Sequence, residues 1–270
     1  MPDHGLPARP AVCWVNTVLF ASVLILLIAS LVSWLRFDQQ AISVVSNSRI
    51  DWDRNFWVYV FTRLGKAWLL VWLLLLWFAV SRRRHEVLTG LLALILVGVL
   101  VNPLKVGVGR TRPYAALRFQ ATGQRDERRS HHLSFPSGDT AAAFAVATAL
   151  LPAVGWPLRV LFLGSSAAIG ALRVTAIAHY PSDVLAGAAI GLLAGWLAVR
   201  LMDKWGQADR AVPFENWFVV GGIVGIAAVQ CISEGPSELL LLLGTYGLLV
   251  PCIALAVKID AAVRGGRRDR

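Results

Sequence analysis

Long apolar stretches without a charged side chain recur along this chain, and they limit its fold more than any other feature. The first, residues 10–35, is long enough to cross a hydrocarbon core of about 30 Å as a helix. Because lipid offers no partner to an exposed peptide group, a spanning segment must be a helix or a strand of a closed barrel. Barrel strands alternate apolar and polar residues, whereas these stretches are uninterrupted. The pattern predicts an all-α integral membrane protein with about eight spans: 10–35, 67–80, 87–104, 140–158, 160–172, 184–199, 217–233 and 239–257.

The composition excludes several other classes of protein. Hydrophobic residues make up 57% of the 270 and charged residues 16%, whereas charged residues are about 25% of a typical soluble domain. An ordinary soluble enzyme, a disordered regulator and a disulfide-stapled secreted domain are therefore excluded. The net charge of +10 is explained by cytoplasmic loops and anionic head groups, and no motif indicates nucleic-acid binding. The three cysteines all lie in apolar stretches and are interpreted as buried thiols.

No repeat or flexible linker divides the chain, so residues 1–270 are expected to form a single membrane domain. Its core is predicted at about 12–202, with two extra C-terminal helices at about 215–258 and a cytoplasmic tail at 259–270. No small-residue cleavage site follows the first stretch, which is therefore expected to be a retained helix. Residues 36–55 are expected to form an outer loop with an interfacial helix.

An even number of spans places both termini on one side of the membrane. If that side is the cytoplasm, 13 of the 26 Lys and Arg residues lie inside, which does not decide the orientation. Eight of the other 13 lie in or near the polar clusters described next, and leaving them out changes the balance to 13 inside and 5 outside. The orientation therefore depends on the function assigned to those clusters: Lys105, Arg110, Arg112, Arg118, Arg125, Arg128, Arg129 and Arg173.

Three polar clusters fall on the same face of this topology. Residues 105–113 follow the third span, and residues 135–139 open the fourth. Arg173 and residues 179–183 join the fifth span to the sixth. Counting spans puts the ends of spans three and five and the starts of spans four and six on the outer side, so the clusters are expected to meet.

Together the clusters supply the groups that bind and attack a phosphate. Arg and Lys side chains suit phosphate oxygens, and the free amides at a helix N-terminus, where Ser137 is placed as the N-cap, form an anion site. His179 lies four residues before Asp183, a spacing that brings the carboxylate to one imidazole nitrogen. The other nitrogen is then free to attack a phosphoryl group.

These residues resemble the signature of the type 2 phosphatidic acid phosphatase superfamily of lipid phosphate phosphatases. That signature is Lys, six residues, Arg-Pro; then Pro-Ser-Gly-His; then Ser-Arg, five residues, His, three residues, Asp. Lys105 and Arg112-Pro113 match the first part with the same spacing, and Arg173, His179 and Asp183 match the third. The resemblance covers residues 105–183 and implies a core of six helices, to which the last two spans are an addition.

The resemblance also implies a role for each matched residue. Lys105, Arg112 and Arg173 hold phosphate oxygens, and Ser137 with the Gly138 amide completes the cradle. His179 is the nucleophile that forms a phosphohistidine, and Asp183 orients it. The family acts on lipid phosphates or diphosphates at the membrane surface without a metal or other cofactor.

Two positions depart from the signature. Leu172 replaces a serine, which is minor, whereas Asp139 replaces the second histidine, the general acid that protonates the leaving oxygen. Asp139 can serve as the acid if a bound phosphate raises its pKa, a diphosphate substrate would need the acid less, or the chemistry is impaired. These three alternatives stay open. His131 and His132, just upstream, are a further source of the proton, although loop histidines are usually only solvated.

Other basic residues have two readings each. The basic residues of 118–129 form a solvated loop or a docking site for an anionic lipid head group. Arg63 and Lys66 anchor the outer end of the second span at the interface or make a second phosphate contact.

The sequence therefore predicts a metal-independent membrane phosphatase that removes a phosphate from a lipid head group. The candidate substrates are lipid A, polyprenyl diphosphate and phosphatidylglycerol phosphate. The alternatives are a lipid-to-lipid phosphotransferase and a non-catalytic lipid-phosphate binder or transporter. The expected location is a bacterial inner membrane, with the site facing the periplasm and both termini in the cytoplasm. Neither nucleic acid nor an obligatory protein partner is expected.

Overall fold

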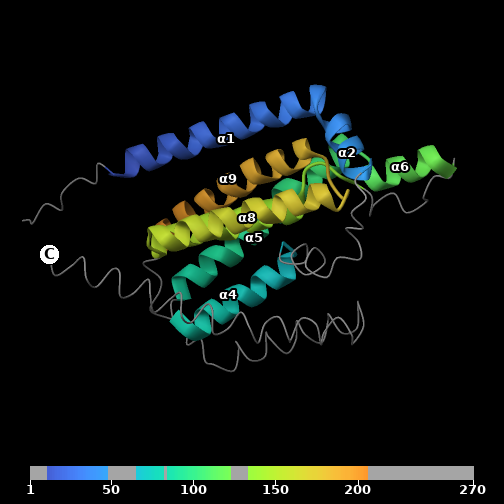
Figure 1. Ribbon diagram of the computed structural model, residues 1–270. Coiled ribbons are helices and arrows are strands. Elements are labelled where there is room, and N and C mark those ends of the chain that lie inside the picture. The colour runs from blue at the N-terminus through green and yellow to red at the C-terminus, as the bar shows by residue number, and fades with distance from the viewer. Residues whose placement is uncertain (1–10, 48–64, 82–83, 123–132, 206–270) are drawn as a thin grey trace, which may run out of the picture.

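The computed structural model describes residues 11–47, 65–81, 84–122 and 133–205. Every regular element in these ranges is a helix, and the one extended pairing among them is an isolated bridge between Thr111 and Leu133. The prediction of an all-α fold is confirmed (Figure 1). The helices are α1 (Ala11–Arg36), α2 (Asp38–Asn47), α4 (Ala67–Ser81), α5 (Arg84–Val108), α6 (Pro113–Thr122), α7 (Gly138–Leu150), α8 (Trp156–Thr175) and α9 (Pro181–Trp205).

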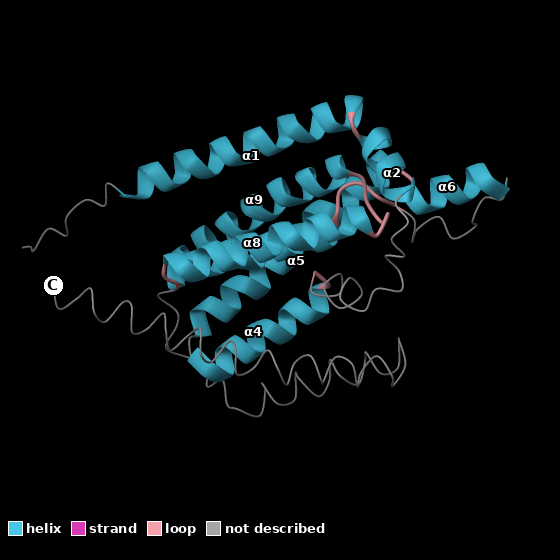
Figure 2. Ribbon diagram, viewed as in Figure 1, coloured by secondary structure: helices cyan, strands magenta, loops and turns pink. Residues whose placement is uncertain are grey.

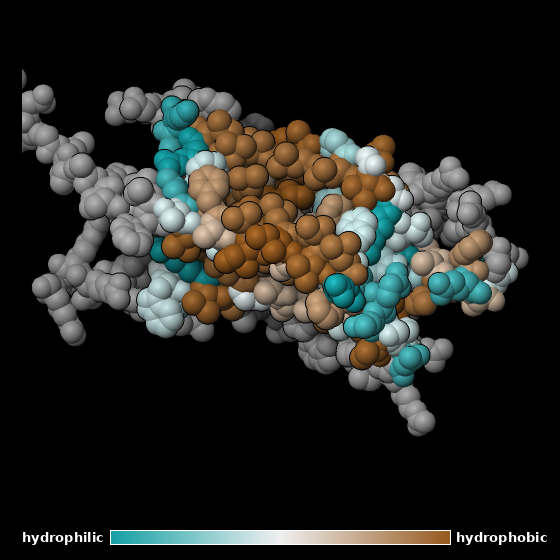
Figure 3. Space-filling view, turned by 90° about the horizontal axis from the view of Figure 1, so that it is seen from above, coloured by the Kyte–Doolittle hydropathy of each residue, from teal (hydrophilic) through white to brown (hydrophobic). Residues whose placement is uncertain are grey.

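Four of these helices are long and apolar enough to cross a membrane: Asn16–Arg36, His85–Val108, Trp156–Thr175 and Pro181–Lys204. The apolar helices Ala67–Trp77 and Gly138–Ala153 are shorter. Hydrophobic side chains cover the middle of the face drawn in Figure 3, and hydrophilic side chains gather toward its two ends. The chain is therefore a membrane protein, as predicted. The expected spans 217–233 and 239–257 and the tail 259–270 lie outside the described residues.

Two boundaries differ from the prediction. The fourth stretch was expected to continue to residue 158, but α7 ends at Leu150, a 3-10 turn covers Leu151–Ala153 and α8 begins at Trp156. Pro152 lies in that turn, and it lacks the N–H group that would continue the helix. The turn is made of apolar residues, so hydropathy alone placed it inside a span. Arg118, expected in a basic loop, lies in α6, which has Pro113 in its first helical position.

The central pair of helices, α7 and α9, approach each other closely because glycines line the contact. A methyl group added at Gly187 would lie 2.5 Å from the carbonyl oxygen of Ser137. The same addition at Gly195 would lie 2.5 Å from the carbonyl oxygen of Ala145. Small residues permit such close packing between helices in lipid, where no hydrophobic force drives association. The start of α9 is thus held directly against the start of α7.

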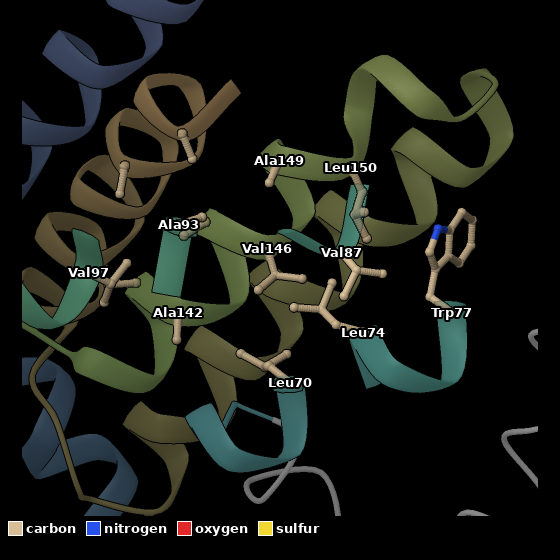
Figure 4. Packing of buried hydrophobic residues seen from close by; sticks show 14 of the residues in the cluster. Leu70, Leu74, Trp77, Val87, Ala93, Val97, Ala142, Val146, Ala149 and Leu150 are labelled. Atoms are coloured by element: carbon tan, nitrogen blue, oxygen red, sulfur yellow. The ribbon is translucent and has the colours of Figure 1, made fainter. Parts of the chain in front are cut away.

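The apolar core lies beside this pair, where α4 and α5 pack on α7 (Figure 4). The indole N–H of Trp77 donates to the Glu86 carboxylate at 2.6 Å and ties α4 to the first turn of α5. This packing fixes the helices on which the polar residues are carried. The core residues labelled in Figure 4 are Leu70, Leu74, Trp77, Val87, Ala93, Val97, Ala142, Val146, Ala149 and Leu150.

Candidate active site

The loops that carry the three polar clusters gather at one end of the bundle, beside α2 and α6 (Figure 2). At this end α5 and α8 finish and α7 and α9 begin. Backbone hydrogen bonds join the loops. The N–H of Ser134 donates to the carbonyl of Arg110 at 2.7 Å, and the N–H of Ser137 donates to the carbonyl of Asp183 at 2.9 Å. The structure therefore brings the three clusters together.

Local sequence explains how each helix ends or begins here. Gly109 has φ +62, a left-handed conformation that glycine adopts without a Cβ clash, and it follows the last residue of α5. Pro181 starts α9, where its missing N–H costs nothing. Ser137 is the N-cap of α7, as expected, but its hydroxyl pairs with the hydroxyl of Thr140 at 2.9 Å and does not cap the helix. The first-turn amides of α7 are therefore not taken up by that hydroxyl, and such amides bind phosphate oxygens.

His179, the expected nucleophile, is 1% exposed and is held by a main-chain acceptor. Its Nδ1 lies 2.9 Å from the carbonyl oxygen of Ser134 and 3.6 Å from Oδ2 of Asp183. A carbonyl only accepts, so the 2.9 Å contact assigns the proton to Nδ1 and leaves Nε2 unprotonated. At 3.6 Å the Asp183 carboxylate is too far for a hydrogen bond, so it acts on the imidazole mainly through its charge.

The surroundings keep this imidazole neutral. Burial lowers the pKa of His179 below the usual value for histidine, and the nearby positive charges of Arg112 and Arg173 lower it further. The Asp183 carboxylate opposes this effect but does not overcome it. A neutral imidazole has a lone pair on Nε2, which is the form that a nucleophile requires.

Asp183 is completely buried, and donors surround both of its oxygens. Oδ2 accepts a hydrogen bond from the Ser134 hydroxyl and another, at 2.8 Å, from the backbone N–H of Tyr180. Oδ1 is paired with Nη1 of Arg110 at 2.8 Å. A buried carboxylate is stable only when it is paired and hydrogen-bonded in this way.

The three cationic residues expected to hold phosphate surround the same place. A Cβ added at Gly138 would lie 3.8 Å from Nζ of Lys105, so this ammonium group lies at the start of α7. Arg112 donates from Nε to the carbonyl of Leu133 at 3.3 Å. All three cationic side chains are partly exposed, whereas His179 is buried. The arrangement suits an anion that enters from the polar end and meets the imidazole behind the cations.

Asp139 lies in this group too, but its carboxylate faces a cation. Its Oδ2 is 2.8 Å from Nη2 of Arg173, and the two side chains are 22% and 12% exposed. Arg173 is one of the expected phosphate ligands, so Asp139 occupies a guanidinium that a phosphate would use. A carboxylate paired in this way accepts from the guanidinium, and only its protonated form could act as a general acid.

Several residues around the site were not selected from the sequence. Arg110 was grouped only with the outer basic residues, although its place inside the first motif was a signal. Ser134 contributes a carbonyl oxygen, which no side-chain pattern reports. Asp38 and Ser182 join Arg110, and Asp38 lies 144 residues before Ser182, so no local spacing connects them. Tyr180 stacks on the guanidinium of Arg110.

Other predictions fall outside the described residues, namely those for Arg63, Arg125, Arg128, Arg129, His131 and His132. Lys66 and Arg118 lie within the described residues, but a phosphate contact of either side chain stays a prediction. Across the described ranges, no three His, Cys, Asp or Glu side chains are grouped so that they could hold a metal ion.

Comparison with known proteins gives matches that contain this site. Residues 86–207 match the model of the PAP2 superfamily. A lipid A 1-phosphatase of Rhizobium johnstonii is 36% identical over 128 residues, which are 44% of this chain and 49% of that protein. A lipid A 1-phosphatase of Rhizobium etli is 40% identical over 113 residues, or 38% of this chain and 43% of that protein. The chain thus spans about half the length of these curated relatives.

A solved structure shares the fold. It is a transmembrane PAP2 type phosphatidylglycerolphosphate phosphatase from Bacillus subtilis, with a TM-score of 0.50 and 23% sequence identity. The likeness covers 74% of this chain and 98% of that one. The segment that matches the family model runs from the first turn of α5 to the end of α9 and contains all eight expected site residues. This segment is therefore similar to the PAP2 superfamily.

Proposed function

We propose that this chain is a membrane-embedded lipid phosphatase that acts through a phosphohistidine on His179. One observation carries the proposal. The imidazole is buried and neutral, and the Ser134 carbonyl orients it through Nδ1. Its unprotonated nitrogen is left for a phosphate held by the partly exposed cations of Lys105, Arg112 and Arg173. The match of residues 86–207 to the PAP2 superfamily and the names of the two relatives support the same activity.

The proposed reaction has two steps. In the first, Nε2 of His179 attacks phosphorus, the N–P bond forms, and the P–O bond to the lipid breaks. The lipid oxygen leaves with the bonding electrons and takes a proton from Asp139 or from water. In the second step, water attacks phosphorus and the N–P bond breaks. The proton that water loses returns to Asp139 or to the solvent, and inorganic phosphate and neutral His179 are regenerated. The cations stabilise the charge on the equatorial oxygens in both steps.

The 1-phosphate of lipid A is the proposed substrate among the three candidates. Two relatives carry the name lipid A 1-phosphatase. The pairing of Asp139 with Arg173 supports this choice, because the carboxylate in the general-acid position is engaged by a guanidinium and not directed at a leaving oxygen. Position 1 of a sugar is the anomeric carbon, and the hemiacetal oxygen leaves more readily than an ordinary alcohol. Such a leaving group depends less on protonation than a simple lipid phosphomonoester does.

The proposed location is a bacterial inner membrane, with the site on the periplasmic face and both termini in the cytoplasm. The polar end of the bundle supports a site at head-group level, because the loops of the site lie where the spanning helices α5 and α8 end. If the site faces the periplasm, the basic residues outside the polar clusters number 13 on the cytoplasmic side and 5 on the periplasmic side, as the positive-inside rule requires.

A head-group panel tests this proposal. Purified protein in detergent with a chelator is incubated with lipid A, polyprenyl diphosphate or phosphatidylglycerol phosphate, and inorganic phosphate is measured. Release is expected from lipid A, specifically from position 1, and is expected to disappear in His179→Ala but not in the matched variant His85→Ala. If the protein releases no phosphate but retains lipid, it is a binder. If phosphate passes to a second lipid, it is a phosphotransferase. Either result would overturn the phosphatase proposal.

A further inference from the structure

Arg110 contacts several residues around the site, although no phosphate-binding role is assigned to it. Its Nη1 lies 2.8 Å from Oδ1 of Asp183 and 2.7 Å from the hydroxyl of Ser182. Its Nη2 lies 2.7 Å from Oδ2 of Asp38. The side chain is 13% exposed and therefore lies mostly inside the protein. One guanidinium thus joins two buried carboxylates that come from opposite ends of the described chain.

Aromatic rings hold this guanidinium in one orientation. Its central carbon is 4.1 Å from the ring centre of Trp34 and 3.8 Å from the ring centre of Tyr180. Trp34 also packs edge-on against Phe135, with the ring centres 5.1 Å apart. A planar cation stacked on ring faces, with its fork directed at two carboxylates, is a geometry that arginine supports and lysine does not.

The second carboxylate, Asp38, belongs to the helix that follows the first span. It is 1% exposed. Besides Arg110, its oxygens accept hydrogen bonds from the hydroxyl of Ser33 at 2.8 Å and from the backbone N–H of Ser182 at 3.0 Å. The hydroxyl of Ser30 donates to the carbonyl of Ser182 at 2.8 Å. The end of α1 and the start of α2 are therefore fastened to the first turn of α9, which carries Asp183.

We propose that Arg110, anchored by Asp38, is a positioning residue that holds the Asp183 carboxylate in place behind His179. The inference rests on the proposed function, because His179 is the nucleophile of that proposal. Arg110 acts through Asp183 and does not touch the phosphate. The first span, which lies outside the three sequence motifs, thereby becomes part of the catalytic machinery.

The expected effect follows from the charges around His179. The charges that act on it are Arg112 before α6, Arg173 from α8 and Asp183 from α9. Lys105 from α5 and Asp139 from α7 belong to the same charge cluster, and Arg110 lies one contact further, against Asp183. Losing Arg110 leaves the charge of Asp183 uncompensated and frees its carboxylate to turn toward Nδ1, now 3.6 Å away. Both changes favour the imidazolium form, so less neutral imidazole is available at neutral pH.

Steady-state kinetics of Arg110→Gln give the first test, with lipid A as substrate. We expect kcat to fall about 10- to 100-fold, the size expected for loss of a hydrogen bond to a charged group, with KM changed by less than about twofold. Arg110→Lys keeps the charge and is expected to recover part of kcat. Arg200→Gln, which removes an arginine near Trp196 on α9, serves as the matched control and should change neither constant. A rise in KM at unchanged kcat would make Arg110 a phosphate ligand and overturn the inference.

A double-mutant cycle tests the link to the first span. Asp38→Asn is expected to lower kcat about tenfold, and Arg110→Gln combined with Asp38→Asn should lose little more than Arg110→Gln alone. Independent, multiplicative losses would show that Asp38 does not act through Arg110. All variants are compared by gel filtration and thermal melting. If Arg110→Gln does not fold, the same double-mutant cycle is measured with Arg110→Lys and Asp38→Asn.

A measurement that needs no substrate separates this inference from the proposed function. The rate at which diethyl pyrocarbonate modifies His179 is followed against pH by peptide mass spectrometry, since only the neutral imidazole reacts. The pH at half-maximal rate should rise in Arg110→Gln and stay near the wild-type value in Arg110→Lys. A profile unmoved in Arg110→Gln overturns the inference even if the protein is an active phosphatase. A shifted profile in a protein without activity supports the inference and contradicts only the proposed function.

Discussion

The two sides of the candidate site are built differently. The nucleophile side (His179, Asp183, Ser134 and Arg110) is almost fully buried, and several hydrogen bonds and ion pairs connect its members. The acid side (Asp139 and Arg173) is partly exposed and is joined by one ion pair at 2.8 Å. In the proposed mechanism, the nucleophile must be oriented before substrate arrives, whereas Arg173 has to exchange the Asp139 carboxylate for a phosphate.

This difference explains how Asp139 can replace the histidine that the family signature has at this position. On the nucleophile side, each oxygen of Asp183 has its own donors, so a changed residue would leave a buried group without a partner. On the acid side, Asp139 is paired with Arg173, and in the proposed mechanism a phosphate displaces it. We therefore expect the nucleophile side to tolerate little change and the acid side to tolerate more.

The largest expected difference is between His179→Ala and Asp139→Ala. Removing the nucleophile should lower phosphate release by at least about 10⁴-fold, since no bond to phosphorus can then form. Removing Asp139 should cost far less, because water can protonate a hemiacetal oxygen. Single-turnover phosphate release in detergent measures both losses. Losses of equal size would show that both sides are equally essential and would contradict the expectation that the acid side tolerates more change.

Asp139→Asn gives the next largest effect and depends on the leaving group. We expect release from a lipid phosphomonoester to fall about 100-fold, at the low end of general acid catalysis, and release from a lipid diphosphate to fall less. The change also frees Arg173 from its ion pair, so orthovanadate should inhibit the variant more strongly. Asp203→Asn, near the other end of α9, is the matched control. Equal activity of Asp139→Asn on both substrates would remove Asp139 from the mechanism.

Ser134→Ala sharpens the comparison within the nucleophile side. The substitution removes the hydroxyl that donates to Asp183 but keeps the carbonyl that accepts from Nδ1 of His179. We expect kcat to fall about tenfold, the low end of the value of a hydrogen bond to a charged group, because Oδ2 of Asp183 keeps its second donor, the N–H of Tyr180. Ser166→Ala, another buried serine, is the control, because its hydroxyl bonds only within α8. A loss as large as that of His179→Ala would show that the hydroxyl, and not the carbonyl, orients the imidazole.

The sequence predicted the helical fold and the meeting of the three clusters, because both follow from hydrophobic length and from counting spans. It predicted the positions of Lys105, Arg112, Arg173, His179 and Asp183 through fixed spacings near helix ends. Those roles stay predictions, although the structure brings the residues together. The turn at Leu151–Ala153 was missed because apolar residues form it, and in a membrane protein hydropathy does not mark such a turn.

The contacts that define the two sides could not be predicted in the same way. Asp38 reaches Ser182 across 144 residues, and only tertiary packing of α1 against α9 creates that contact. The acceptor for His179 is the main-chain oxygen of Ser134, which every residue type possesses. The pairing of Asp139 with Arg173 depends on side-chain direction at two helix ends. The local sequence pattern therefore located the site but did not predict which charged side chains pair with one another.

The smallest expected effect concerns pH and tests whether the nucleophile side keeps His179 neutral. Because burial and two nearby guanidinium groups lower its pKa, protonation should begin only at a more acidic pH than for a free histidine. A histidine of ordinary pKa would lose about fourfold in its neutral fraction between pH 8 and pH 6, so a smaller loss is expected. Modification of His179 by diethyl pyrocarbonate across this range measures the imidazole directly and avoids the second ionisation of phosphate near pH 6.

His85 in the same samples gives a reference away from the site. A half-maximal rate at or above the pH found for His85 would mean that Asp183, and not burial, controls the imidazole. A larger share of the imidazole would then carry a proton near neutral pH, and that share would have to lose the proton before attack.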